Sequence, residues 1–129
     1  MAIGRYQLTA LDCPDALALA AFYSQITGWP VREQFEGLPQ WIELVSETGA
    51  TIAFQQVDNY SPPAWPGQEH PQQLHLDFEV ADLEEGERAV LAIGAVKHEF
   101  QPMPKAFRVY LDPAGHPFCL VAQDWETQD

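Results

Sequence analysis

The stretch QLHLDFEV, residues 73–80, alternates apolar and polar side chains along its length. A strand places successive side chains on opposite faces, so the two kinds of side chain separate. The apolar face would hold Leu74, Leu76, Phe78 and Val80, and the polar face His75, Asp77 and Glu79. The polar face either meets water or lines a cavity with an imidazole and two carboxylates.

Two other segments have the composition and end signals of helices. Residues 15–27 are rich in helix formers and are followed by Gly28, a residue type that commonly ends a helix. Residues 82–93 open with the aspartate and glutamate spacing of a capping box and are followed by Gly94. We therefore predict a helix over each of these two segments.

Short runs of β-branched and aromatic residues predict the remaining strands. Two hairpins are expected, with strands at 41–45 and 51–57 in the first and at 107–111 and 117–121 in the second. Further strands are expected at 31–35 and 96–100. Residues 61–71 contain four prolines, which excludes a regular element there and predicts a linker or a surface loop.

The two halves of the chain repeat one pattern. Residues that lie 66 positions apart match in type, as in Gly28 with Gly94, Trp41 with Phe107, and Gly49 with Gly115. Each half is therefore predicted to be a βαβββ module, at about 5–57 and 73–123, joined by a proline-rich linker at 58–72. Because so small a module cannot bury its sheet alone, we expect both to share one core in a single α+β domain over 1–129.

Composition excludes some classes of partner. Nineteen acidic and six basic residues give a formal charge of −13, which repels phosphate backbones and anionic membrane surfaces. We therefore expect no nucleic-acid partner and no membrane association. The sequence has no apolar run long enough to span a bilayer and no signal segment at its start, so a cytoplasmic protein is expected. The two cysteines show no CxxC spacing and are expected to be reduced.

Three segments together resemble the vicinal oxygen chelate superfamily, the group of glyoxalases, bleomycin-resistance proteins and extradiol dioxygenases. They are LDCPDALALAAFYSQITGWPV at 11–31, QLHLDFEVADLEEGERAVLAIGA at 73–95 and FRVYLDPAGHPFCLV at 107–121. The resemblance implies two βαβββ modules that form an open, U-shaped barrel around a cavity, and it makes a homodimer the expected assembly. The uncovered face of each sheet would line the cavity, so His75 and Asp77 should point inward.

The resemblance also identifies the positions of metal ligands. In metal-dependent members each module supplies one ligand from its first strand and one from its last, which here are Leu8 and Ala53, then His75 and Cys119. Only His75 is a ligand of the usual type, and leucine and alanine have no lone pair to offer. We therefore expect no complete metal site and no cofactor.

Two alternatives to that expectation involve the same residues. A divalent ion could be held by His75 and Cys119 with a further ligand from Asp77 or Glu43. Cys119 could also act as a nucleophile with His75 as its base, although a cysteine in PFCLV is more often a small buried hydrophobic residue.

The remaining candidates are aromatic residues and one histidine. Most aromatic side chains are expected in the core, among them Trp29, Trp41, Phe54, Phe107 and Tyr110. Trp65 and Tyr60, in or beside the linker, are expected either at a cavity mouth or packed over a sheet edge. His116 lies in DPAGHPF, where turn geometry is the expected role.

Two functions stay open. The first is binding of a small organic molecule without a metal, in an aromatic cavity where His75, Asp77 and Gln55 make the polar contacts. The second is a lyase, isomerase or dioxygenase in which His75 is a catalytic residue, either as metal ligand or as general base. A protein-interaction module would leave the inward polar face without a purpose.

Overall fold

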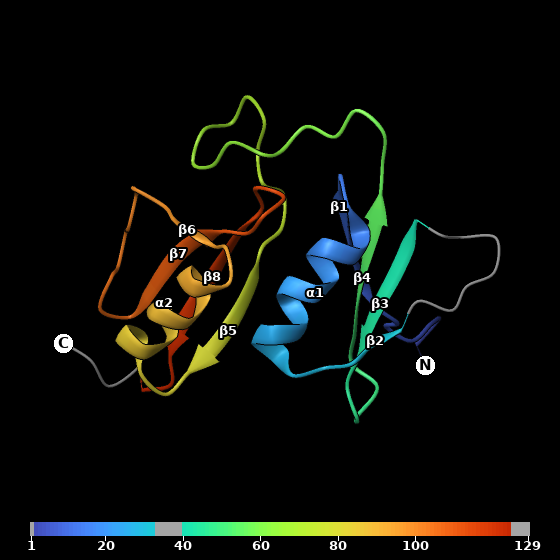
Figure 1. Cartoon of the computed structure of the whole chain (residues 1–129), viewed down its shortest axis with the longest axis horizontal. Coiled ribbons are helices and arrows are strands. Elements are labelled where there is room, and N and C mark those ends of the chain that lie inside the picture. The colour runs from blue at the N-terminus through green and yellow to red at the C-terminus, as the bar shows by residue number, and fades with distance from the viewer. Residues whose placement is uncertain (1, 33–39, 125–129) are drawn as a thin grey trace. The chain divides into compact units, whose positions relative to one another are not determined.

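The computed structural model describes residues 2–32 and 40–124 (Figure 1). The chain divides into two compact units, Met1–Tyr60 and Ser61–Asp129, and the predicted linker spans the boundary between them. Each unit contains one helix and one four-stranded sheet in the order βαβββ. The predicted α+β class and its two βαβββ modules are therefore confirmed.

Unit 1 contains β1 (Thr9–Cys13), α1 (Ala16–Thr27), β2 (Val31–Arg32), β3 (Trp41–Val45) and β4 (Thr51–Gln56). Its sheet has the order β1-β4-β3-β2, with β1 parallel to β4 and the other neighbours antiparallel. The second strand was predicted over 31–35, and residues 33–35 lie outside the described part of the chain.

The ends of α1 follow the signals in its sequence. The Asp15 carboxylate accepts a hydrogen bond from the Ala18 backbone N–H at 3.0 Å, which satisfies one of the free donors of the first turn. At the other end Gly28 takes a left-handed φ of 74°, a conformation that costs glycine little. The helix buries Tyr23 against its sheet, where the ring stacks on Phe54 at 5.7 Å.

Unit 2 contains β5 (Leu76–Val80), α2 (Leu83–Ala92), β6 (Val96–Lys97), β7 (Phe107–Leu111) and β8 (Pro117–Ala122). Its sheet has the order β5-β8-β7-β6, which repeats the topology of unit 1. Helix α2 is capped by Asp82, whose carboxylate accepts from the Glu85 backbone N–H at 3.0 Å. Figure 1 shows each helix lying against the sheet of its own unit.

The predicted strand over 96–100 is wrong in length, because β6 ends at Lys97. The side chain of Gln101 replaces further strand pairing with β7. Its amide oxygen accepts from the Val109 N–H at 2.9 Å, and its amide nitrogen donates to the Val109 carbonyl at 2.8 Å. The His98 N–H still donates to the Val109 carbonyl at 3.0 Å, but the Gln101 side chain occupies the Val109 N–H, so regular pairing with β7 ends at this point.

The registers of the two sheets confirm the internal repeat. Ala10 pairs with Ala53 where β1 meets β4, and Asp77 pairs with Cys119 where β5 meets β8. These pairs occupy equivalent places, since the first strands are offset by 67 residues and the last strands by 66. Equivalent positions of the two units can therefore be compared by the side chains that they carry.

Candidate functional site

The sheet of unit 2 has one face covered by α2 and one face that carries polar groups. Phe78 lies on the covered face, with its ring 6.2 Å from that of Phe118 on β8. Asp77 and Glu79 alternate with Phe78 and are exposed, as the pattern of residues 73–80 predicted. The alternating pattern covers residues 73–80, but β5 begins at Leu76, so the strand is three residues shorter at its start and His75 lies directly before it.

His75 and Asp77 form a pair on the uncovered face. Nε2 of His75 lies 3.2 Å from Oδ1 of Asp77, and the two side chains are about half exposed. Cys119 is the strand partner of Asp77, and one donor atom from each of the three residues lies within 4.8 Å of the others. The structure therefore brings together three of the residues that the sequence singled out.

A cavity of about 290 Å³ opens beside this group. His75, Asp77 and Cys119 contribute its polar wall, and the other lining residues are Met103, Ala106, Phe107 and Val121. All four of these are apolar, and all belong to unit 2. The cavity thus combines an aromatic and aliphatic wall with an imidazole and a carboxylate, the composition that small-molecule sites usually have.

The thiol of Cys119 is in a poor environment for nucleophilic chemistry. Several effects raise the pKa of Cys119 to about 12. Burial is the largest, and the Asp77 carboxylate adds to it through its charge and through a hydrogen bond. A thiol with such a pKa stays protonated near neutral pH, and the thiolate is the reactive form. Cys119 therefore behaves as a small buried residue that is only 6% exposed.

The equivalent face of unit 1 lacks donors at the two ligand positions. Leu8 is half-buried just before β1, and Ala53 on β4 is fully buried. Neither side chain can coordinate an ion, so the described residues do not fit the four-ligand site that the superfamily implies. Gln55 is exposed on β4 in the same unit.

Glu43, which the sequence analysis named as a possible additional metal ligand, binds other residues of unit 1. It is 5% exposed, its Oε1 lies 2.6 Å from Nη2 of Arg32, and its Oε2 accepts from Nε1 of Trp41 at 2.8 Å. A buried carboxylate needs such partners to offset its lost hydration. Its chemistry is that of a structural ion pair.

Trp65 and His116 make contacts away from the cavity beside His75. The ring of Trp65 packs against His98 at 5.1 Å and Phe100 at 5.3 Å, and its carbonyl accepts from Nε2 of His98 at 2.9 Å. Trp65 is not among the residues that line the 290 Å³ cavity. The backbone N–H of His116 donates to Oδ1 of Asp112 at 3.0 Å within the β7–β8 turn.

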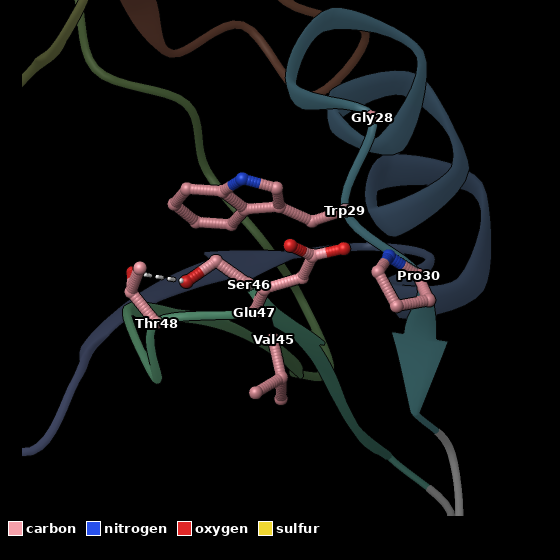
Figure 2. A pocket seen from close by; sticks show the side chains of 7 residues that line it. All are labelled: Gly28, Trp29, Pro30, Val45, Ser46, Glu47 and Thr48. Atoms are coloured by element: carbon pink, nitrogen blue, oxygen red, sulfur yellow. Dashed lines mark hydrogen bonds between the residues drawn. The ribbon is translucent and has the colours of Figure 1, made fainter.

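A second pocket, of about 540 Å³, lies in unit 1 where the end of α1 meets the turn between β3 and β4. Its walls are residues 28–30 and 45–48 (Figure 2). Sequence reasoning missed it and assigned Trp29 to the core. The signal that could have indicated it is a tryptophan directly after a helix-ending glycine, since such a residue leaves the helix toward the surface.

Comparison with known proteins gives the same fold. A family model described as a glyoxalase-like domain matches residues 9–121. A glyoxalase/bleomycin resistance protein/dioxygenase family enzyme from Burkholderia phytofirmans superposes with a TM-score of 0.64 at 19% identity, over 90% of this chain and 96% of that one. A fosfomycin resistance protein from Listeria monocytogenes superposes with a TM-score of 0.67 at 17% identity, over 94% and 92% of the two chains.

A search of curated proteins gave no match. Within the described residues, neither helix is long and apolar enough to cross a membrane. The match of the family model over nearly the whole chain, with the repeated βαβββ units, shows that the chain belongs to the glyoxalase-like domain family of the vicinal oxygen chelate superfamily.

Proposed function

We propose that this protein binds a small organic molecule in the cavity of unit 2, without a metal ion, and that His75 and Asp77 make the polar contacts. The observation that carries the proposal is the cavity of about 290 Å³, in which these two side chains face an apolar wall. This volume lies close to the lower limit of ligand pockets, which is about 300 Å³, so the guest is small. Gln55, the third predicted polar contact, belongs to unit 1 and is not among the residues that line this cavity.

The walls indicate the chemistry of the guest. Phe107 and Met103 offer an aromatic face and a polarizable thioether, which suit a ring or a short hydrocarbon. The Asp77 carboxylate accepts hydrogen bonds, so a guest with an N–H or O–H donor is favoured over an anion. The name of the Listeria relative associates this fold with resistance to a small antibiotic, which agrees with a small-molecule ligand.

The donor set supports a metal-free mode of binding. The imidazole of His75 is paired with Asp77, the Cys119 thiol is held in its protonated form, and Leu8 and Ala53 have no donor. A catalytic ion needs firm ligands together with an open position. Three donors of this kind on one sheet make a weak site for such an ion.

A second candidate function is favoured by one distance. A carboxylate 3.2 Å from an imidazole is the arrangement that orients a histidine as a general base. In this alternative His75 removes a proton from a bound guest, as an isomerase or a lyase requires. Deuterium exchange into a bound carbonyl compound in D₂O, lost in His75→Ala, would favour the enzyme over the binder.

The test of binding uses Met103 as a reporter inside the cavity. The chain has two methionines, so a ¹³C-methyl methionine label gives two NMR signals, and Met103→Leu assigns them. Single-ring aromatic amides, amines and carboxylic acids are titrated as probes. We expect at least one amide or amine to shift the Met103 signal saturably and the carboxylic acids to bind more weakly.

Two variants connect that signal to the proposed contacts. His75→Ala should weaken binding about tenfold, the effect of losing one well-placed polar contact of about 1.4 kcal/mol. His70→Ala is the matched control, because His70 is also an exposed histidine of unit 2 and does not line the cavity. Absence of any saturable shift at Met103, or equal affinity in the two variants, would contradict the proposal.

A further inference from the structure

The second pocket, in unit 1, is lined by an aromatic ring and by polar groups that can bind one ligand together. It lies in unit 1, between the end of α1 and the β3–β4 turn, and measures about 540 Å³. Its walls contain one indole, one carboxylate and two hydroxyl groups, from Trp29, Glu47, Ser46 and Thr48. Figure 2 shows the Glu47 carboxylate pointing to the same side of the turn as the Trp29 ring.

The backbone of Trp29 is anchored on both sides. Its N–H donates to Oγ1 of Thr27 at 3.1 Å, and its carbonyl accepts from Oγ of Ser24 at 2.7 Å. These bonds hold the residue that carries the indole in a fixed place just after the helix. The ring is therefore presented with little loss of freedom when a ligand binds.

The opposite wall is also ordered before a ligand arrives. Ser46 and Thr48 share a hydrogen bond between their hydroxyl groups at 3.0 Å. The Ser46 N–H donates to the Ala50 carbonyl at 2.8 Å and the Gly49 N–H donates to the Ser46 carbonyl at 3.1 Å. The turn that places Glu47 is thus closed by its own backbone, and Glu47 itself is exposed.

Electrostatics in this pocket favours positive charge. The pocket includes Gly28 at the end of α1, where the helix dipole is negative, and the last turn of α1 contains no basic residue. The seven lining residues include a glutamate and no lysine, arginine or histidine. The chain as a whole has a formal charge of −13. The carboxylate in this pocket therefore has no cationic partner among the residues that line it.

We propose that this pocket binds a small organic cation of the alkylammonium class, held between the Trp29 indole and the Glu47 carboxylate. The face of an indole attracts a cation through its quadrupole, and tryptophan is the strongest of the aromatic side chains in this respect. The carboxylate adds direct charge pairing, and the helix end adds the field of its dipole. The pocket lies in unit 1, so this proposal is independent of ligand binding beside His75.

Choline and 3,3-dimethylbutan-1-ol are the probes, because they share a shape and differ only in the charge of the quaternary centre. Binding is followed on the indole N–H signal of Trp29 in ¹⁵N NMR spectra, assigned with Trp29→Phe. We expect saturable shifts with choline and binding of the neutral alcohol weaker by about fivefold or more, the range of a cation–π contact plus a carboxylate.

Variants separate this pocket from general attraction of cations by an acidic protein. Glu47→Gln and Trp29→Leu should each weaken choline binding about 3- to 10-fold. Glu69→Gln removes one exposed carboxylate in unit 2 and should leave choline affinity unchanged. Glu47 lies exposed in a turn, so its variant remains informative even if Trp29→Leu fails to fold.

Three results would overturn the proposal. One is the absence of a saturable shift of the Trp29 signal up to about 50 mM choline, which is weaker than any useful affinity. The second is equal binding of choline and its neutral isostere. The third is an affinity that falls as much in Glu69→Gln as in Glu47→Gln, since the attraction would then belong to the net charge rather than to this pocket.

Discussion

Asp77 and Cys119 are strand partners across β5 and β8, and this pair places a half-exposed carboxylate beside a buried thiol. The equivalent partners in unit 1 are Ala10 and Ala53, which carry no polar group. The second unit has therefore gained two functional groups at a position where the first has only methyl groups. The consequence for the thiol is an elevated pKa.

Removal of the Asp77 charge should make Cys119 more reactive. Burial raises the pKa of Cys119 most, and the Asp77 carboxylate raises it further. In Asp77→Asn the contribution of the carboxylate disappears, so the pKa of Cys119 falls. The thiolate fraction at pH 8, and with it the rate of alkylation, should therefore rise about 3- to 10-fold. Iodoacetamide labelling, followed by mass spectrometry of the peptide that contains Cys119, measures this rate and separates it from that of Cys13.

Glu79→Gln is the matched control for that experiment, because Glu79 is a second exposed carboxylate on β5. It should leave the rate of Cys119 alkylation close to that of the unmodified chain. An Asp77→Asn rate equal to or below the Glu79→Gln rate would show that the carboxylate does not hold the thiol protonated.

Glu87 on α2 is the centre of a network on the covered face of unit 2. Its Oε1 accepts from the hydroxyl of the buried Tyr110 at 2.9 Å and lies 2.9 Å from Nζ of Lys97 and 3.3 Å from Nη1 of Arg108. Glu87→Ala leaves the Tyr110 hydroxyl buried without this acceptor, which costs about 1–3 kcal/mol of unfolding free energy. Urea denaturation at pH 7 measures the loss, and Glu84→Ala, which removes an exposed partner of Arg108, should cost less.

The Glu87 contribution should depend on pH. Burial raises the pKa of Glu87, but hydrogen bonds and charges from Lys97, Tyr110 and Arg108 outweigh it, so the pKa lies below the ordinary 4.5. A carboxylate with a lowered folded pKa contributes stability above the unfolded pKa and loses it as the pH falls through the folded value. The stability difference between Glu87→Ala and the unmodified chain should therefore shrink below pH 4.5. A difference that grows in acid would contradict this sign.

Local signals in the sequence predicted most elements of the fold. Strand β3 and strand β7 have the predicted bounds, and each helix begins directly after the first residue of its predicted segment, Asp15 or Asp82. These features depend on residues within one turn or one strand. Such signals are therefore readable without knowledge of the tertiary structure.

Contacts that depend on tertiary position could not be predicted from the sequence. Glu87 meets Lys97 and Arg108 only because α2 packs against the sheet of its unit, and no spacing along the chain specifies that meeting. The Trp29 pocket depends on where a helix end lies relative to a turn. The alternation of residue types was enough to predict that His75 and Asp77 share one face. The proximity of Cys119 depends in addition on the internal repeat and on the register of β5 with β8.

The protein should have no metal-dependent lactoylglutathione lyase activity. Leu8 and Ala53 occupy two of the four ligand positions implied by the superfamily and have no donor atom. Elemental analysis after loading with nickel, zinc or manganese, and turnover of the methylglyoxal–glutathione hemithioacetal, test this expectation. Stoichiometric metal together with turnover would contradict it and would favour the enzyme alternative.

A symmetric homodimer stays a prediction from the resemblance. The described residues include exposed apolar side chains at Val31 on β2 and Val96 on β6, each an edge strand of its sheet. An isologous contact would cover such edges, which are otherwise open to uncontrolled pairing. Sedimentation equilibrium at micromolar concentration should give twice the mass of the 14.5 kDa chain. A single 14.5 kDa species would contradict the prediction.

Gly49 and Gly115 occupy equivalent turns in the two units and provide a matched pair for a stability measurement. Both have a left-handed φ, of 95° and 88°, so an alanine at either position is strained by about 1–2 kcal/mol. Their surroundings differ. A Cβ at position 49 meets nothing within 4 Å, whereas at position 115 it would lie 2.8 Å from Cβ of Pro62.

The two alanine variants should therefore differ in stability. Gly49→Ala should lose only the backbone strain, while Gly115→Ala should lose a further amount of about 1–3 kcal/mol from the overlap with Pro62. Pro62→Ala does not relieve the overlap, because alanine keeps the Cβ, whereas Pro62→Gly removes that atom. The double variant Pro62→Gly/Gly115→Ala should consequently lose less than the two single changes added together. The coupling between positions 62 and 115 is measured by urea denaturation of the unmodified chain, Gly49→Ala, Gly115→Ala, Pro62→Gly and the double variant. Additive losses of stability would show that the linker segment does not pack against this turn.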